Sequence, residues 1–183
     1  MAGWLEGARR VASPNCDRRP PGTEVGLVVL HSISLPRGRY RKDAGGKDAG
    51  DAIERLFTNR LDPAAHPSFA GLAGLRVSSH FLIYRDGELV QFVPLEASAW
   101  HAGASRWRGR ERCNDFSVGI ELEGTDDGPF ESAQYEVLAG LLRRLALALP
   151  VRHLAAHSDV APGRKTDPGT RFDWPRLLAA LGR

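Results

Sequence analysis

The sequence His153-Leu-Ala-Ala-His157-Ser-Asp-Val-Ala-Pro-Gly-Arg-Lys-Thr-Asp167-Pro-Gly169 joins a short apolar run to a polar loop that contains two Pro-Gly pairs. The apolar run predicts a strand, and polar clusters at strand ends are typical of sites built on a rigid scaffold. Imidazole and carboxylate are common zinc ligands, and a catalytic zinc needs three protein ligands and one open position. The loop offers two ligands, His157 and Asp167, so a third must come from elsewhere.

The best candidate for the third ligand is His31, which ends the run Val25-Gly-Leu-Val-Val-Leu-His31. Leu27 to Leu30 are continuously apolar, as expected of a strand buried on both faces. Taken alone, a histidine that closes a strand is more often a hydrogen-bonded structural residue. The prediction of a metal site therefore depends on the combination of His31, His157 and Asp167.

A third strand is predicted around Val118-Gly-Ile-Glu-Leu-Glu123, where alternation places Glu121 and Glu123 on the same face. Two carboxylates on one face need solvent or a cation nearby, which an active site provides and a solvated edge strand also provides. An amide hydrolase needs a carboxylate that takes a proton from water and delivers one to the leaving nitrogen. From the residues alone, both glutamates remain candidates for this role.

Two further charged residues in the loop have competing interpretations. Lys165 could stabilise a developing oxyanion, although a surface lysine is the simpler reading. The spacing His157-x-Asp159 also suits a non-haem iron site, but no histidine follows His157 in the sequence. We therefore interpret Asp159 as a residue that caps the loop.

The remaining pattern predicts an α/β fold in one domain that spans residues 1–183, with residues 1–24 as an irregular N-terminal arm. The 183 residues are 42% hydrophobic and 26% charged, which is ordinary for a globular protein. Strands are expected at 26–31, 79–85, 88–93 and 116–122, with Asp86-Gly87 as a hairpin turn; helices are expected at 51–57 (capped by Asp51), 132–149 (capped by Ser132) and 174–181.

Composition also bears on partners and location. The net charge of +3 is small for this length, and the basic residues are scattered except around 37–42 and 106–112. This pattern argues against nucleic acid as a partner and favours the carboxylates of an acidic peptide. We expect neither a secretory signal nor a membrane span, and two distant cysteines, Cys16 and Cys113, fit reduced thiols in the cytoplasm.

Four stretches in the same order resemble the zinc-dependent N-acetylmuramoyl-L-alanine amidases, most closely their cytoplasmic 1,6-anhydro branch. The resemblance covers about Trp4 to Trp174, and the long matches at 110–126 and 157–169 are its most specific parts. It implies a mixed central sheet flanked by helices, as in peptidoglycan-recognition proteins. The stretches are His31-Ser-Ile-Ser-Leu-Pro36, Trp100-His-Ala-Gly103, Arg110 to Asp126 and His157 to Gly169.

The resemblance implies that His31, His157 and Asp167 bind Zn²⁺, and it selects Glu121 over Glu123 as the catalytic carboxylate, beside a catalytic Lys165. The implied substrate is a soluble 1,6-anhydro-muropeptide, cut between the lactyl group of N-acetylmuramic acid and L-alanine by an enzyme of cell-wall recycling. We separately expect the protein to be a monomer. Candidate substrate contacts are Ser32, Arg76, His80, Trp100, His101 and Arg112: a tryptophan can stack on a sugar, and arginines can pair with peptide carboxylates.

Two features depart from the family pattern. Ser32 stands where this branch commonly has Asn, which is expected to alter a substrate hydrogen bond. The stretch 37–51 is longer than the usual connection and is rich in Gly, Lys, Arg and Asp. Two other functions fit the sequence less well. A non-catalytic wall-binding module is disfavoured because the predicted ligands and base are all present, and a secreted or phage-type lytic amidase because the sequence shows no wall-binding repeat.

Overall fold

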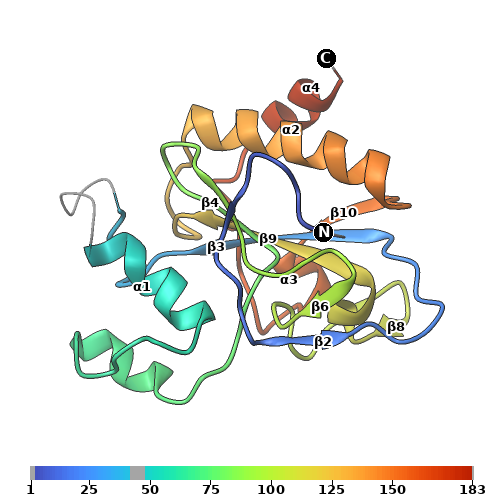
Figure 1. The fold of residues 1–183 in the computed structure, drawn as a ribbon. Helices are drawn as coiled ribbons and strands as arrows, with labels where there is room; N and C mark the ends of the chain where they lie inside the picture. Colours follow the sequence, from blue (N-terminus) through green and yellow to red (C-terminus); the bar gives the residue numbers. More distant parts are fainter. Residues whose placement is uncertain (1–2, 42–47, 183) are drawn as a thin grey trace.

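A six-stranded sheet runs through the middle of the molecule, and helices pack on its faces (Figure 1). The structure is a computed structural model that describes residues 3–41 and 48–182. The strands of this sheet are β1 (Arg9–Arg10), β3 (Leu27–Ile33), β4 (Phe81–Ile83), β5 (Leu89–Gln91), β9 (Ser117–Glu123) and β10 (His153–Ala156). Their order is β1-β5-β4-β9-β3-β10, and every neighbouring pair is parallel except β4 with β5. The predicted mixed α/β sheet is confirmed.

Two small ladders lie beside the main sheet. They are β2 (Cys16–Arg18) with β6 (Ala97–Ala99), and β7 (Arg106–Trp107) with β8 (Arg110–Glu111). The prediction that residues 1–24 are irregular is wrong at two places, because β1 and β2 lie within them. Strands of two or three residues are too short to show alternation, so they form only because the edges of β5 and β6 are available for pairing.

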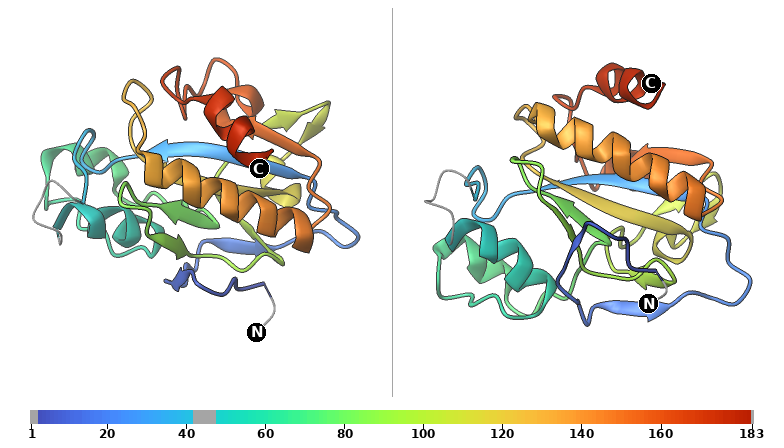
Figure 2. Two further views of the ribbon diagram at one scale, coloured as in Figure 1. Left: turned by 90° about the horizontal axis from the view of Figure 1, so that it is seen from above. Right: turned by 45° about the horizontal axis from the view of Figure 1, so that its top comes forward.

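The longest helix, α2 (Ser132–Ala148), crosses one face of the sheet, and α4 (Trp174–Leu181) packs outside it (Figure 2). On the other side, α1 (Asp48–Phe57) and the 3₁₀ helix η1 (Pro67–Leu72) cover the end of the sheet near β4. Two short helical turns, η2 (Cys113–Phe116) and α3 (His157–Val160), precede β9 and follow β10 respectively.

Two predicted helix caps are wrong. The first helix begins at Asp48, three residues before the predicted cap Asp51, so most of the predicted long connection at 37–51 lies outside the described residues or within α1. In α2 the cap is Glu131 instead of Ser132, and the Gln134 side chain accepts from the Glu131 N–H at 3.0 Å. By contrast, the 174–181 helix matches its prediction.

Alternation along β3 and β9 sorts their side chains onto two faces. Val28 and Leu30 of β3, with Ile120 of β9, join the core beneath α2, which Leu138 enters fully buried. Residues of the opposite parity point to the other face, where Leu27 and Val29 belong to a second cluster. His31 and Glu121 share that second parity, so the sheet presents both of them on the side away from α2.

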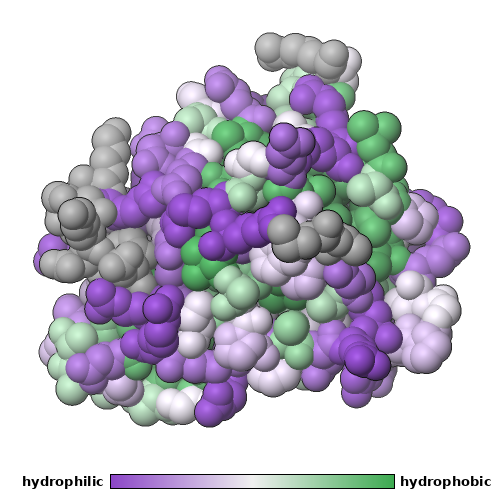
Figure 3. Space-filling model, viewed as in Figure 1, coloured by the Kyte–Doolittle hydropathy of each residue, from purple (hydrophilic) through white to green (hydrophobic). Residues whose placement is uncertain are grey.

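The surface is mixed in character. In the view of Figure 3, hydrophilic residues cover most of the visible surface. Hydrophobic residues gather towards the right, where Figure 1 draws the end of α2. Within the described part of the chain, no helix is both long enough and apolar enough to cross a bilayer.

Candidate active site

Three neighbouring parallel strands bring the predicted polar residues to the same level. His31 on β3 pairs directly with Glu121 on β9. On the other side of β3, Ala156 of β10 pairs with Leu30, so the next residue, His157, emerges beside His31. Because the strands are parallel and in register, three side chains that are distant in the sequence meet near the C-terminal ends of these strands.

Asp167 completes a triangle with the two histidines. Nδ1 of His31 lies 2.9 Å from Nδ1 of His157, and Oδ2 of Asp167 lies 3.2 Å from the first nitrogen and 3.0 Å from the second. The loop that carries Asp167 is held to α3, because the Ser158 N–H donates to the Asp167 carbonyl at 3.1 Å. The structure therefore brings together the three predicted metal ligands as one compact group.

The triangle has the chemistry of a metal site. Nε2 of His157 faces the Ala102 carbonyl at 3.3 Å, which can only accept, so the proton lies on Nε2 and Nδ1 presents a lone pair. Burial lowers the pKa of His31 to about 4, which keeps that imidazole neutral and able to ligate. Ligands bound to tetrahedral zinc at about 2.0–2.1 Å lie a little over 3 Å apart, close to the spacing seen here. The residues fit a zinc ion.

Glu121 lies beside this triangle in an unusual environment. Its side chain is buried, and Oε2 has no hydrogen-bond partner. Burial raises the pKa of Glu121 well above its ordinary value, the negative charge of Asp167 raises it further, and Lys165 acts in the opposite direction. A carboxyl group whose pKa is raised holds a proton more readily than an ordinary carboxylate, which is a property that a general acid–base uses.

Glu123, the other candidate, has a structural environment instead. Its carboxylate accepts hydrogen bonds from the Arg41 N–H at 2.7 Å and the Arg85 N–H at 3.1 Å. Both oxygens therefore hold neighbouring loops in place. Of the two glutamates on this face, only Glu121 combines a free oxygen with a position level with His31.

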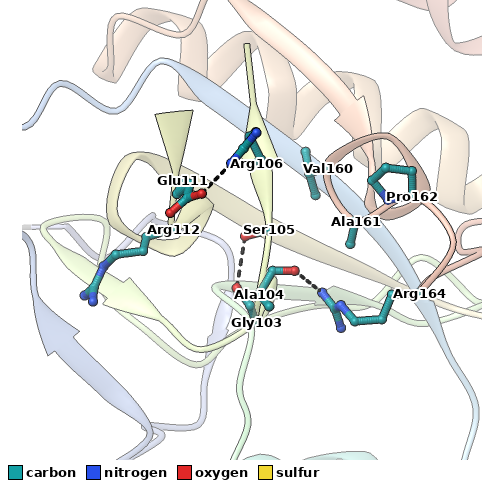
Figure 4. A pocket seen from close by; sticks show the side chains of 10 residues that line it. All are labelled: Gly103, Ala104, Ser105, Arg106, Glu111, Arg112, Val160, Ala161, Pro162 and Arg164. Carbon is teal, nitrogen blue, oxygen red and sulfur yellow. Dashed lines mark hydrogen bonds and ion pairs between the residues drawn. The ribbon is translucent and has the colours of Figure 1, made fainter. Parts of the chain in front are cut away.

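Arg164 lines two clefts, of which the smaller reaches the triangle at Asp167. One, of about 290 Å³, is bordered by Asp167, Lys165 and Ser32. The other, of about 470 Å³, lies between β7–β8 and α3 and carries Arg106, Glu111 and Arg112 (Figure 4). The Arg164 guanidinium donates to the carbonyls of Ala102 and Ala104, at 2.6 and 2.8 Å, and so stands between the clefts.

The six predicted substrate contacts are not gathered in one place. Ser32 and Arg112 each line one of the two clefts. Nδ1 of His101 lies 2.9 Å from Nε2 of His31. The other three lie away from both clefts. The Trp100 indole donates to Asp17, and His80 is fully buried with its Nδ1 accepting from the Gly119 N–H. Arg76 borders a small separate pocket near α1.

Sequence reasoning missed Arg164 and Asp126. Asp126 accepts from Arg37 at 2.7 Å and from the Thr166 hydroxyl at 2.6 Å, which joins three loops at the rim of the smaller cleft. Both residues lie inside the most specific stretches, 110–126 and 157–169, so their position there was the available signal. Asp159, interpreted as a cap, does accept from the Ala156 N–H at 2.8 Å.

Comparison with known proteins agrees with this geometry. A family model described as N-acetylmuramoyl-L-alanine amidase matches residues 21–170. The 1,6-anhydro-N-acetylmuramyl-L-alanine amidase AmpD of Escherichia coli (strain K12) is 53% identical over 183 residues, which cover 99% of this chain and 96% of that protein. The chain belongs to the N-acetylmuramoyl-L-alanine amidase family.

Solved structures of this amidase family share the fold. The crystal structure of a selenomethionine AmpD derivative is 51% identical, has a TM-score of 0.92, and is covered to 98% by 99% of this chain. A complex of the E. coli amidase AmiD with anhydro-N-acetylmuramic acid-L-Ala-D-γ-Glu-L-Lys is 28% identical, with a TM-score of 0.62, over 89% of this chain and 60% of that one. As a member of the family, the chain is an N-acetylmuramoyl-L-alanine amidase.

The raised pKa of Glu121 generates a prediction about the stability of the metal-free amidase. A carboxyl group whose pKa is higher in the folded state takes up a proton on folding. Its contribution to the free energy of unfolding therefore falls as the pH rises above the ordinary pKa of about 4.5. Glu121→Gln should therefore be more stable than the wild type at pH 8, by about 1–3 kcal/mol. The advantage should shrink towards pH 4.5, as measured by urea unfolding.

Glu123→Gln is the comparison variant: burial raises the pKa of Glu123 too, but its carboxylate accepts two backbone hydrogen bonds, and the amide would lose one of these acceptors. It should destabilise the protein at both pH values. An effect of Glu121→Gln that stays the same at pH 4.5 and pH 8 would contradict the assignment, since it could not arise from ionisation.

Proposed function

We propose that this amidase uses zinc to hydrolyse soluble 1,6-anhydro-muropeptides, and that it recycles cell-wall fragments in the cytoplasm. The observation that carries the proposal is the convergence of two imidazole lone pairs and a carboxylate beside a buried, unpartnered Glu121. The E. coli relative is a 1,6-anhydro-N-acetylmuramyl-L-alanine amidase and AmiD binds an anhydro-N-acetylmuramic acid peptide, which supports the choice of an anhydro-sugar substrate.

In this proposal His31, His157 and Asp167 hold the metal. When bound, zinc supplies Lewis acidity, which makes the amide carbonyl a better electrophile and water a better nucleophile. The chain contributes the geometry: the parallel register fixes the two histidines, and the hydrogen bond from Ser158 fixes the loop that carries Asp167. Burial of both imidazoles keeps water from competing for their lone pairs.

Glu121 is the proposed proton carrier. Its free oxygen can accept a proton from the attacking water, and its raised pKa lets it hold that proton before passing it to the leaving nitrogen. Lys165 lies close enough for its charge to act on both Glu121 and His31. An ammonium group in that position can stabilise the negative charge that develops on the carbonyl oxygen.

The two clefts give room for the two halves of the substrate on either side of Arg164. Arg112 borders the larger cleft with an 80% exposed side chain, whose Nε donates to Asp115 at 2.9 Å; a peptide carboxylate would approach its terminal nitrogens. Ser32 borders the smaller cleft, where its hydroxyl replaces the amide of the expected Asn and can make fewer hydrogen bonds. We propose both residues as substrate contacts.

The metal ligands can be tested by zinc content. Asp167→Ala should lower bound zinc from about one equivalent per chain to far less, because it removes one of three ligands. Asp127→Ala, whose carboxylate is 75% exposed and pairs with Arg37, is the matched control and should keep its zinc. Atomic absorption of both variants decides; undiminished zinc in Asp167→Ala, with loss in Asp159→Ala, would show that the wrong carboxylate was chosen.

The role of Glu121 can be tested by kinetics. Glu121→Gln keeps the shape of the side chain but cannot carry a proton, so kcat should fall by a factor of about 10²–10⁴ while zinc stays bound. Glu123→Gln, if it folds, should retain far more activity. Near-normal turnover by Glu121→Gln together with an inactive Glu123→Gln would transfer the role to Glu123.

Substrate preference is tested by comparing soluble anhydro-muropeptide with polymeric wall. Hydrolysis of the soluble fragment, followed by mass spectrometry of the products, should greatly exceed hydrolysis of purified sacculi. Arg112→Ala should mainly raise KM, because a carboxylate contact is made equally in the ground and transition states. Comparable rates on sacculi would reject the proposed preference while leaving the amidase activity intact.

A further inference from the structure

Behind the proposed metal ligand His31 runs a continuous line of hydrogen bonds. Nε2 of His31 lies 2.9 Å from Nδ1 of His101, and Nε2 of His101 lies 3.0 Å from the Ser117 hydroxyl. That hydroxyl lies 2.5 Å from the Cys113 carbonyl, where the line ends. Both ends are buried, since His31 is 2% exposed and Ser117 and Cys113 are fully buried.

The end of the line fixes the direction of every proton in it. The Cys113 carbonyl can only accept, so the Ser117 hydroxyl donates to it and offers lone pairs to His101. For neutral imidazoles, His101 must then carry its proton on Nε2 and present a lone pair at Nδ1. That lone pair accepts the Nε2 proton of His31.

The consequence falls on the far side of the His31 ring. With its proton on Nε2, His31 presents the Nδ1 lone pair to His157 and Asp167. The other tautomer would place a proton between the ligand atoms and block a metal. In many metal sites the non-ligating nitrogen of a histidine is held in this way by a second group.

The backbone of β9 is shaped to accept the His101 ring. A Cβ atom at Gly119 would lie 2.4 Å from Cγ of His101 and 2.7 Å from its Nδ1. The absence of a side chain at Gly119 leaves room for the ring against the strand, between His31 and Ser117. The packing and the hydrogen bonds therefore specify the same ring position independently.

We propose that His101 and Ser117 are positioning residues that hold His31 in the tautomer required for metal binding. The inference rests on the proposed function, because it concerns the zinc ion expected at His31, His157 and Asp167. It assigns to His101 a role behind the metal ligand, in addition to the substrate contact expected from the sequence.

The first test is the zinc dissociation constant of Ser117→Ala, measured by competition with a chromogenic chelator. Loss of the hydroxyl leaves the His101 tautomer unspecified, so the dissociation constant should rise by a factor of about 10–100. Ser79→Ala is the matched control, since Ser79 is also a fully buried serine but its hydroxyl has no hydrogen-bond partner. It should bind zinc as tightly as the wild type.

The second test separates hydrogen bonding from packing at His101. His101→Leu fills the space but offers no acceptor to His31, whereas the side-chain oxygen of His101→Asn can replace Nδ1. We expect weak zinc binding in the first variant and recovery of most of the affinity in the second. Thermal unfolding of the metal-free variants reports fold damage separately, and Ser117→Ala decides alone if His101→Leu does not fold.

The outcomes separate the positioning role of His101 and Ser117 from the proposed zinc amidase function. Equal zinc affinity in the wild type and Ser117→Ala, or equally weak binding by His101→Leu and His101→Asn, would overturn the positioning role while leaving the zinc amidase intact. A wild-type protein that binds no zinc would overturn the proposed function, and with it the inference.

Discussion

The parallel register of β9, β3 and β10 is the constraint on which the rest of the site depends. It sets Glu121, His31 and His157 side by side near the C-terminal ends of the three strands, on the face turned away from α2. If one of these strands slipped by one residue, its polar side chains would face the apolar core and its core residues would face the site. The core beneath α2 therefore fixes the active-site geometry, because burial of Leu30 and Ile120 on one face determines where their neighbours point.

The same register forces polar groups into a poorly hydrated place. A buried carboxylate without a hydrogen bond, such as Glu121, is costly, and so is a cluster of lone pairs with no proton between them. A bound cation offsets both costs, and any ligand that binds only the folded state adds to its stability. The buried carboxylate and the clustered lone pairs thus raise the free energy of the metal-free site, and the same two features favour a bound metal.

Much of this arrangement could be predicted from local sequence pattern, and the exceptions have a common cause. Apolar runs that end in His31 and His157, and the alternation around Glu121, predict strands and faces correctly because burial imposes those patterns. The short strands β1 and β2, the cap at Glu131 and the position of Arg76 could not be predicted in this way. Each of them depends on which partner lies nearby in the folded chain, and no periodicity in the sequence encodes that partner.

The loop after β10 shows how ligand and cleft are coupled. Its Asp167 faces the histidines, its Thr166 donates to Asp126, and its Arg164 donates to the carbonyl of Ala102, which also accepts from His157. One short segment therefore contacts the metal triangle and the walls of both clefts. A displacement of this loop in either cleft would therefore also move Asp167 relative to His31 and His157.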